Sequence, residues 1–113
     1  MGFNFNRPSF RKYNNIPTEV DGYKFDSLAE ARHYQDLLKL KKAGIVLHID
    51  LHPVFILAPG VKYIADFMVY YADGHIEVQD VKGVETKEFK IKKKLFNSMH
   101  PLAPLKLIKA RGR

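Results

Sequence analysis

Two runs of strand-forming residues, Tyr63–Tyr71 and His75–Lys82, flank the pair Asp73-Gly74, and this arrangement constrains the fold more than any other feature of the chain. An Asp-Gly pair between two such runs is typical of a β-hairpin. The first run contains the acid Asp66, and the second ends on Asp80-Val-Lys82. The sequence therefore predicts a hairpin that carries two carboxylates and an amine.

The register of this hairpin decides whether the two acids share a face, because side chains alternate between faces along a strand. A two-residue loop would place Asp66 and Asp80 on opposite faces. A three-residue loop, in which Gly74 adopts the left-handed conformation of a bulge, would pair them directly. We predict the three-residue loop Ala72–Gly74, which also pairs Ile64 with Lys82, Met68 with Val78 and Tyr70 with Ile76.

Local signals predict the remaining elements. We expect a small hairpin over Thr18–Phe25, a helix over Leu28–Ala43 that Ser27 opens, a strand over Val54–Leu57, a helix from Thr86 to Met99 and a strand over Leu105–Ile108. The segment Ile45–Ile49 is either a short strand or an extended connector. In the second helix, the expected inner face consists of Phe89, Leu95, Phe96 and Met99.

Composition limits the class of protein. The 113 residues suffice for one compact domain, which we place at residues 19–113 after a basic N-terminal arm at residues 1–18. The absence of cysteine excludes disulfides and thiolate zinc sites. The apolar runs are too short to span a bilayer and the N-terminus lacks the apolar core of a signal peptide, so we expect a cytoplasmic protein without a membrane partner.

The net charge of +7 is concentrated at the two ends of the chain. Residues 87–113 hold nine Lys or Arg against the single acid Glu88, and five of the eight residues from Lys87 to Lys94 are lysine. Basic patches of this kind indicate a nucleic-acid partner, although a solvated basic surface is the alternative. The candidate contacts to DNA phosphates are Lys87, Lys90, Lys93, Lys94, Arg11 and Arg111, and such contacts confer no strong sequence specificity.

The hairpin acids are candidate ligands of a divalent cation, because facing carboxylates without one would repel each other. We expect Mg²⁺ or Mn²⁺ at Asp66 and Asp80, with the backbone carbonyl of Val81 as a further ligand. Lys82 is then placed to orient a water molecule and to stabilise charge on a phosphate. The alternative for Asp80 and Lys82 is a local salt bridge of little energetic value.

Two readings of Glu30 remain open. Ser27 and Glu30 fit a capping box, in which the carboxylate folds back onto the amide of Ser27. The helical spacing also allows Glu30 to reach the hairpin carboxylates and join the metal site, directly or through water. The five histidines lack the spacing of a helical metal pair, so we expect surface or packing roles for them, including His52.

Several segments together resemble a small phage and prophage family of unassigned function within the PD-(D/E)xK nuclease superfamily. These are Val20–Ser27, Glu30–Tyr34, His52-Pro53, Tyr63–Phe67, Asp80–Gly83 and the lysine-rich helix that follows. The resemblance implies a restriction-endonuclease-like α/β fold with an αβββαβ core, in which a mixed sheet lies between two helices. It also implies metal ligation by Asp66 and Asp80, catalysis by Lys82, and Glu30 as the acid of the first helix.

The activity that this resemblance implies is metal-dependent DNA hydrolysis by an endonuclease, with Mg²⁺ or Mn²⁺ as cofactor. Short members with this set of acids resemble Holliday-junction resolvases, which act on branched DNA as homodimers in the cytoplasm of the bacterial host. The alternatives are a nicking or recombination-associated endonuclease on flaps or single strands, and a non-catalytic DNA-binding packaging accessory protein.

Overall fold

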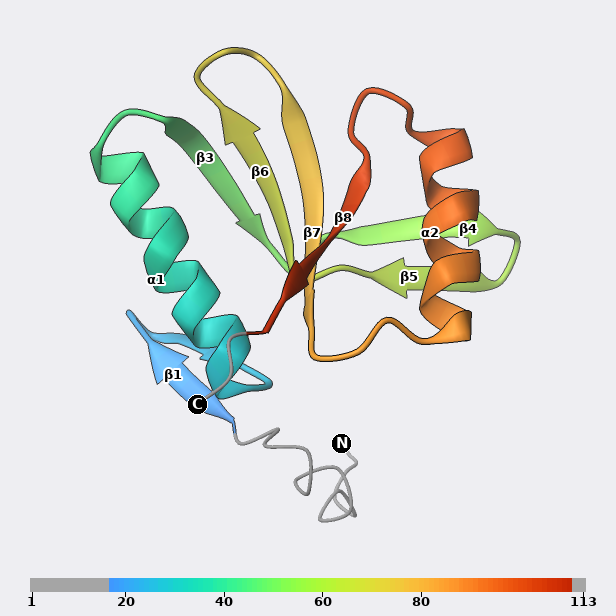
Figure 1. The fold of residues 1–113 in the computed structure, drawn as a ribbon, viewed down its shortest axis with the longest axis horizontal. Coiled ribbons are helices and arrows are strands. Elements are labelled where there is room, and N and C mark those ends of the chain that lie inside the picture. The colour runs from blue at the N-terminus through green and yellow to red at the C-terminus, as the bar shows by residue number, and fades with distance from the viewer. Residues whose placement is uncertain (1–16, 111–113) are drawn as a thin grey trace.

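A four-stranded mixed sheet forms the centre of the protein, for which the computed structural model describes residues 17–110 (Figure 1). Its strands lie in the order β3 (Val46–Leu51), β6 (Phe67–Tyr71), β7 (Ile76–Lys82) and β8 (Leu105–Lys109). The pairs β3–β6 and β6–β7 are antiparallel, and β8 runs parallel to β7. With the helices α1 (Leu28–Lys42) and α2 (Lys87–Met99), this sheet confirms the expected mixed α/β class.

Each face of the sheet packs against one helix, because alternate side chains point to opposite sides. Phe67 and Val69 of β6 lie in one apolar cluster with Ala31, Tyr34 and Leu37 of α1. The other cluster joins residues of β7 and β8 to residues of α2, and it contains Val78, Leu105, Phe89 and Phe96. The sheet therefore has a core on both sides, and only its ends and edges are available for a polar site.

Two of the predicted turns are present. Asp21 and Gly22, with φ angles of 53° and 82°, join β1 (Thr18–Val20) to β2 (Tyr23–Phe25), which confirms the small N-terminal hairpin. Met68 pairs with Val78 and Tyr70 with Ile76, so the larger hairpin has the predicted three-residue loop. Gly74 has a φ of 99°, which is the left-handed conformation that this loop requires.

The expectation of one continuous strand from Tyr63 to Tyr71 is wrong, because the chain leaves one sheet and enters another at Ala65 and Asp66. The strand β5 (Val61–Ile64) pairs with β4 (Val54–Ala58) in a separate two-stranded sheet, and Ile64 therefore pairs with Val54 instead of Lys82. At the break, the N–H of Ala65 donates to the carbonyl of Pro53 (3.0 Å). The first strand of the main sheet is β3, at the segment that the sequence left open as strand or connector.

The second helix presents a narrower apolar face than expected. Phe89 and Phe96 are buried, but Leu95 and Met99 are 42% and 43% exposed, so their assignment to the inner face is wrong. The two buried residues are seven positions apart, and the helix therefore meets the core along a single line. No helix among the described residues is long and apolar enough to cross a membrane. Most of the expected N-terminal arm, residues 1–16, lies outside the described part of the chain.

Candidate metal site and nucleic-acid surface

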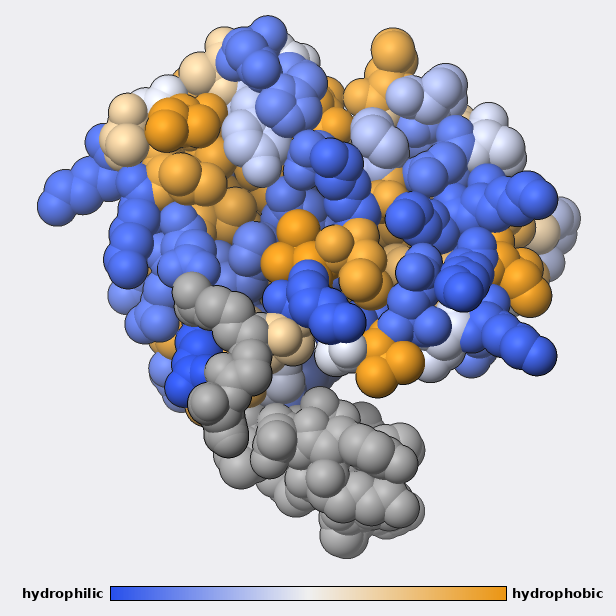
Figure 2. All heavy atoms as spheres, in the orientation of Figure 1, coloured by the Kyte–Doolittle hydropathy of each residue, from blue (hydrophilic) through white to orange (hydrophobic). Residues whose placement is uncertain are grey.

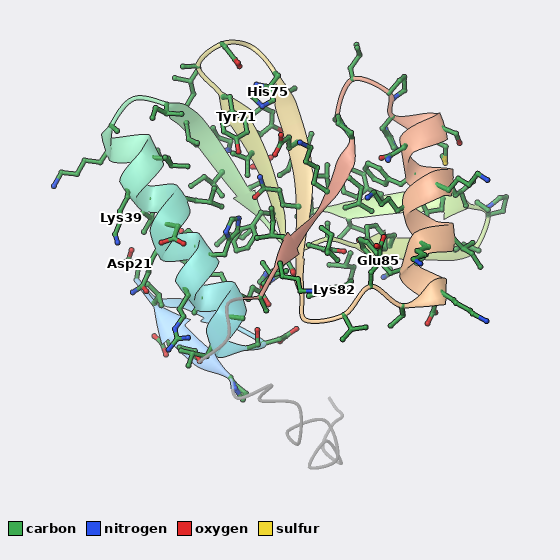
Figure 3. All side chains as sticks on the ribbon, in the orientation of Figure 1. Asp21, Lys39, Tyr71, His75, Lys82 and Glu85 are labelled. Atoms are coloured by element: carbon green, nitrogen blue, oxygen red, sulfur yellow. The ribbon has the colours of Figure 1, made fainter. Side chains whose placement is uncertain are left out.

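The predicted site residues from the hairpin and the first helix come together at one end of the sheet. β7 ends at Lys82 there, β6 begins at Phe67 directly after Asp66, and β3 ends at Leu51 opposite Phe67. The first turn of α1, which contains Glu30, begins near this end of the sheet (Figure 1). Figure 3 places Lys82 at the same end, far from Tyr71 and His75 at the other.

Two hydrogen bonds join Asp66 to the segment that contains Asp80 and Val81. The N–H of Asp66 donates to Oδ1 of Asp80 (2.8 Å), and the N–H of Val81 donates to Oδ2 of Asp66 (2.8 Å). The hydroxyl of Tyr63, from β5, donates to Oδ2 of Asp80. The Asp66 carboxylate can accept the N–H of Val81 because the strand breaks at Asp66 and the β6–β7 ladder ends one residue later, at Phe67. Asp80 itself is 3% exposed.

Glu30 faces this end of the sheet with a partner that the sequence did not predict. Its backbone N–H donates to Oγ of Ser27 (3.1 Å), so Ser27 caps the helix as expected. The Oε2 atom of its carboxylate, however, lies 2.7 Å from Nε2 of the His52 imidazole. Only half of the capping box is therefore present among the described hydrogen bonds, and the side chain of Glu30 is left for the site.

Two lysines bring positive charge to the acids. Nζ of Lys82 lies 5.1 Å from the ring centroid of Phe89 in α2. Nζ of Lys92, also from α2, lies 5.9 Å from the ring centroid of Tyr63, whose hydroxyl contacts Asp80. Lysines over aromatic rings keep their charge close to the apolar rim of the site instead of in bulk water.

The three acids have raised pKa values, and burial is the main cause for each. Burial, followed by the charge of Asp66, raises the pKa of Glu30 from 4.5 to about 7, although His52 acts in the opposite direction. Burial also raises the pKa of Asp66 and that of Asp80, against hydrogen bonds from backbone N–H groups and the charge of Lys82. The negative charge at this end of the sheet is therefore only partly compensated by the protein's own groups.

The donor set fits a hard divalent cation. Carboxylate oxygens are the ligands that Mg²⁺ prefers, and each oxygen that already accepts one hydrogen bond has a further lone pair. Within residues 17–110, no three His, Asp or Glu side chains are grouped closely enough to hold an ion by themselves. Mg²⁺ usually binds one or two protein carboxylates and retains several waters, and the pair Asp66 and Asp80 meets that requirement. Ligation by the carbonyl of Val81 stays a prediction.

The candidate DNA-binding lysines lie on α2, as expected. Lys87, Lys90 and Lys94 are exposed and Lys93 is half-buried. Hydrophilic side chains gather over α2 on the face shown in Figure 2. Arg11 and Arg111, the other two candidates, lie outside the described residues. The basic helix begins after a connection of four residues that follows Lys82, so its first turn, with Lys87, is tied closely to the acidic end of the sheet.

Sequence reasoning missed three residues of this site. Lys92 is three residues after Phe89 and four before Phe96, and this helical spacing was a usable signal that it lies towards the buried side. His52 precedes Pro53 at a turn, but no local pattern indicates which way its side chain points. Tyr63 reaches Asp80 only because β4 and β5 fold back on α2, which is a tertiary effect without a local signature.

Comparison with known proteins identifies the family of this chain. Residues 10–111 match the model of a family described as "Protein of unknown function (DUF1064)". The chain matches no curated protein and no solved structure. Because the family match extends over nearly the whole sequence, including every residue of the candidate metal site, this chain belongs to the DUF1064 family.

Proposed function

We propose that this protein is a Mg²⁺- or Mn²⁺-dependent endodeoxyribonuclease with a restriction-endonuclease-like αβββαβ core. The main support is the buried pair Asp66 and Asp80, which backbone hydrogen bonds hold at one end of the sheet, within reach of the positive charge of Lys82. Burial raises the pKa of both acids. A protein that only binds DNA has no use for buried carboxylates next to phosphates, since the two would repel. The element order α1, β3, β6, β7, α2, β8 also agrees with this core, with β4 and β5 inserted after the first strand.

Asp66 and Asp80 would hold the cation, and Glu30 would join them directly or through a water molecule. Such a cation, when bound, polarises a water molecule and stabilises the charge that develops on the scissile phosphate. The ammonium of Lys82 would orient the attacking water and would stabilise the same negative charge from the side of α2. Lys92 adds a second positive charge near Asp80. This charge acts to lower the pKa of Asp80, against the larger effect of burial.

The exposed lysines Lys87, Lys90 and Lys94 would bind the DNA backbone. Contacts of this kind position the duplex without reading its sequence, so we expect weak sequence preference. Arg11 and Arg111 would make further contacts of the same kind with the DNA backbone. The preferred substrate in our proposal is branched DNA, such as a Holliday junction of phage recombination in the bacterial cytoplasm, and symmetric cutting of a junction would require a homodimer.

Cleavage assays test this function. Supercoiled plasmid, a four-way junction and single-stranded DNA are incubated with Mg²⁺, Mn²⁺ or EDTA, and wild type is compared with Asp80→Asn. Metal-dependent cutting that the variant lacks would support the nuclease, and the preferred DNA would separate a junction resolvase from a nicking or flap enzyme. DNA binding without cutting of any substrate would overturn the catalytic claim in favour of a DNA-binding accessory protein.

A further inference from the structure

The backbone of His52 has a conformation that is uncommon for residues other than glycine. His52 has a φ of 51°, and Asp21 is the only other non-glycine residue with positive φ between residues 17 and 110. Asp21 lies in a two-residue hairpin turn, where aspartate is a common residue. His52 does not lie in a two-residue hairpin turn, and the proline that follows it restricts its backbone further. A strained residue of this kind persists only where the surrounding structure holds it, and such residues cluster at functional sites.

The turn that contains His52 is held from both sides of the strand break at Asp66. The N–H of His52 donates to the carbonyl of Asp66 (2.9 Å). The carbonyl of the next residue, Pro53, accepts the N–H of Ala65 (3.0 Å). The imidazole then extends to Glu30 and places Nε2 2.7 Å from Oε2 of its carboxylate. One residue thus contacts two acids of the candidate site, Asp66 through its backbone and Glu30 through its side chain.

We propose that His52 is a positioning residue that orients the carboxylate of Glu30 towards the cation site at Asp66 and Asp80. This inference rests on the proposed cation-dependent function. The side chain of Glu30 is 5% exposed, so its carboxylate depends chiefly on the protein for hydrogen-bond partners. The Ser27 hydroxyl engages the backbone N–H of Glu30 and leaves its carboxylate free to rotate. The left-handed turn at His52 brings the imidazole to that carboxylate while fixing the backbone of Asp66.

A purely structural role for His52 makes a different prediction for metal affinity. Groups that orient a metal-binding carboxylate typically change metal affinity by about 10- to 100-fold when they are removed. A residue that only stabilises the turn would change the melting temperature and leave the affinity of the folded protein unaltered. The affinity for a cation, measured below the melting temperature of each variant, therefore separates the two roles.

The experiment is a titration of the protein with Mn²⁺ alone, read by the electron paramagnetic resonance of the free ion. Glycine adopts positive φ without strain, so His52→Gly keeps the turn and removes only the imidazole. His52→Asn is a second variant that tolerates the left-handed conformation but is too short to reach Glu30. We expect about a tenfold or greater loss of Mn²⁺ affinity in both variants, and recovery to within about threefold of wild type in His52→Gln, whose amide can reach Glu30.

Two controls assign the effect to the contact with Glu30. Asp21→Gly makes the same backbone change at a remote turn and should leave Mn²⁺ affinity unchanged. In a Glu30→Gln background, His52→Gly should cause little further loss, because residues that act through one contact are not additive. An undiminished loss in that background, or wild-type affinity in His52→Gly and His52→Asn, would overturn the inference and leave the proposed function standing. Absence of Mn²⁺ binding in the wild type would overturn both.

Discussion

The two ends of strand β7 contain acids in opposite electrostatic situations. At the loop end, Glu77 contacts Lys106 (3.3 Å), His75 (3.4 Å) and the amide of Gln79 (2.9 Å). At the other end, Asp80 accepts hydrogen bonds from the N–H of Asp66 and the hydroxyl of Tyr63. Within residues 17–110, Asp80 forms no ion pair with a Lys, Arg or His side chain. Figure 3 shows His75 near the first end and Lys82 near the second.

The pKa values of the two acids differ in direction for this reason. Burial opposes ionisation of both, but hydrogen bonds from Gln79 and Lys106 outweigh it at Glu77 and lower its pKa. At Asp80 burial prevails and the pKa is raised. A protein gains nothing in stability from a buried acid that its own groups do not neutralise. The comparison assigns Glu77 a structural role. In our proposal, Asp80 belongs to a site that a bound cation completes.

The largest expected effect is the difference in DNA cleavage between a variant that lacks the acid Asp80 and one that lacks the acid Glu77. Asp80→Asn removes a candidate metal ligand, and we expect cleavage to fall about a thousandfold or more. Glu77→Gln is the matched variant from the same strand and should retain activity within about twofold, since Glu77 lies away from the reacting groups. Single-turnover cleavage of plasmid DNA at saturating Mg²⁺ measures both. Equal losses in the two variants would show that the two ends of β7 do not differ in function.

Acids at the two ends of β7 should also differ in their effect on the free energy of unfolding when metal is absent. The pKa of Glu30 is about 7 in the folded protein and 4.5 ordinarily, so its stabilising effect is full below pH 4.5 and is lost as the pH rises through 7. The metal-free protein should therefore lose on the order of 3 kcal/mol over this range through Glu30, and Glu30→Gln should lose less than the wild type by about that amount. Denaturant unfolding in EDTA at pH 5 and pH 8 measures the difference.

Glu77→Gln is the comparison for this experiment. Its contacts with Lys106 and Gln79 favour the charged form, so its replacement should lower the free energy of unfolding at pH 8 by about 1 kcal/mol. Glu30→Gln should raise that free energy under the same conditions. The account is contradicted if both replacements destabilise the metal-free protein at pH 8.

The smallest expected effect concerns the lysines of α2. Each of Lys87→Ala, Lys90→Ala and Lys94→Ala should weaken DNA binding similarly for all sequences and should reduce the salt slope of log K by about 1. Lys39→Ala is the control, because Lys39 is also an exposed helical lysine but lies on α1 (Figure 3). Fluorescence anisotropy across a salt series measures the slopes. A lysine of α2 whose replacement leaves the slope unchanged does not contact phosphate.

Much of the fold was predictable because its signals are local. The turn at Asp21-Gly22 and the loop that ends on Gly74 follow from backbone preferences of single residues, and the cap Ser27 follows from its side-chain hydroxyl. The register of the β6–β7 hairpin followed from the requirement that Asp66 and Asp80 share a face, and it is confirmed. The meeting of the two aspartates therefore combines a predicted register with a strand break that was not predicted.

The errors arise where distant segments decide the structure. The strand ends at Ile64 because β5 pairs with β4 instead of β7, and no pattern within residues 63–71 records that choice. His52 reaches Glu30 across 22 positions through a left-handed turn, which composition and periodicity do not encode. Leu95 and Met99 are exposed because only one line of α2 meets the sheet. Sequence patterns indicate the candidate acids of such a site more readily than the residues that contact them.

The most direct test of the central claim is the effect of Mg²⁺ on the melting temperature of wild type and of Asp80→Asn. A cation that binds only the folded protein adds about 1.4 kcal/mol at ten times its Kd, which corresponds to roughly 5–10 °C for a domain of this size. The account predicts this rise over EDTA for the wild type and its absence in Asp80→Asn. An equal rise in both proteins, or none in the wild type, would contradict a cation site at the acidic end of β7.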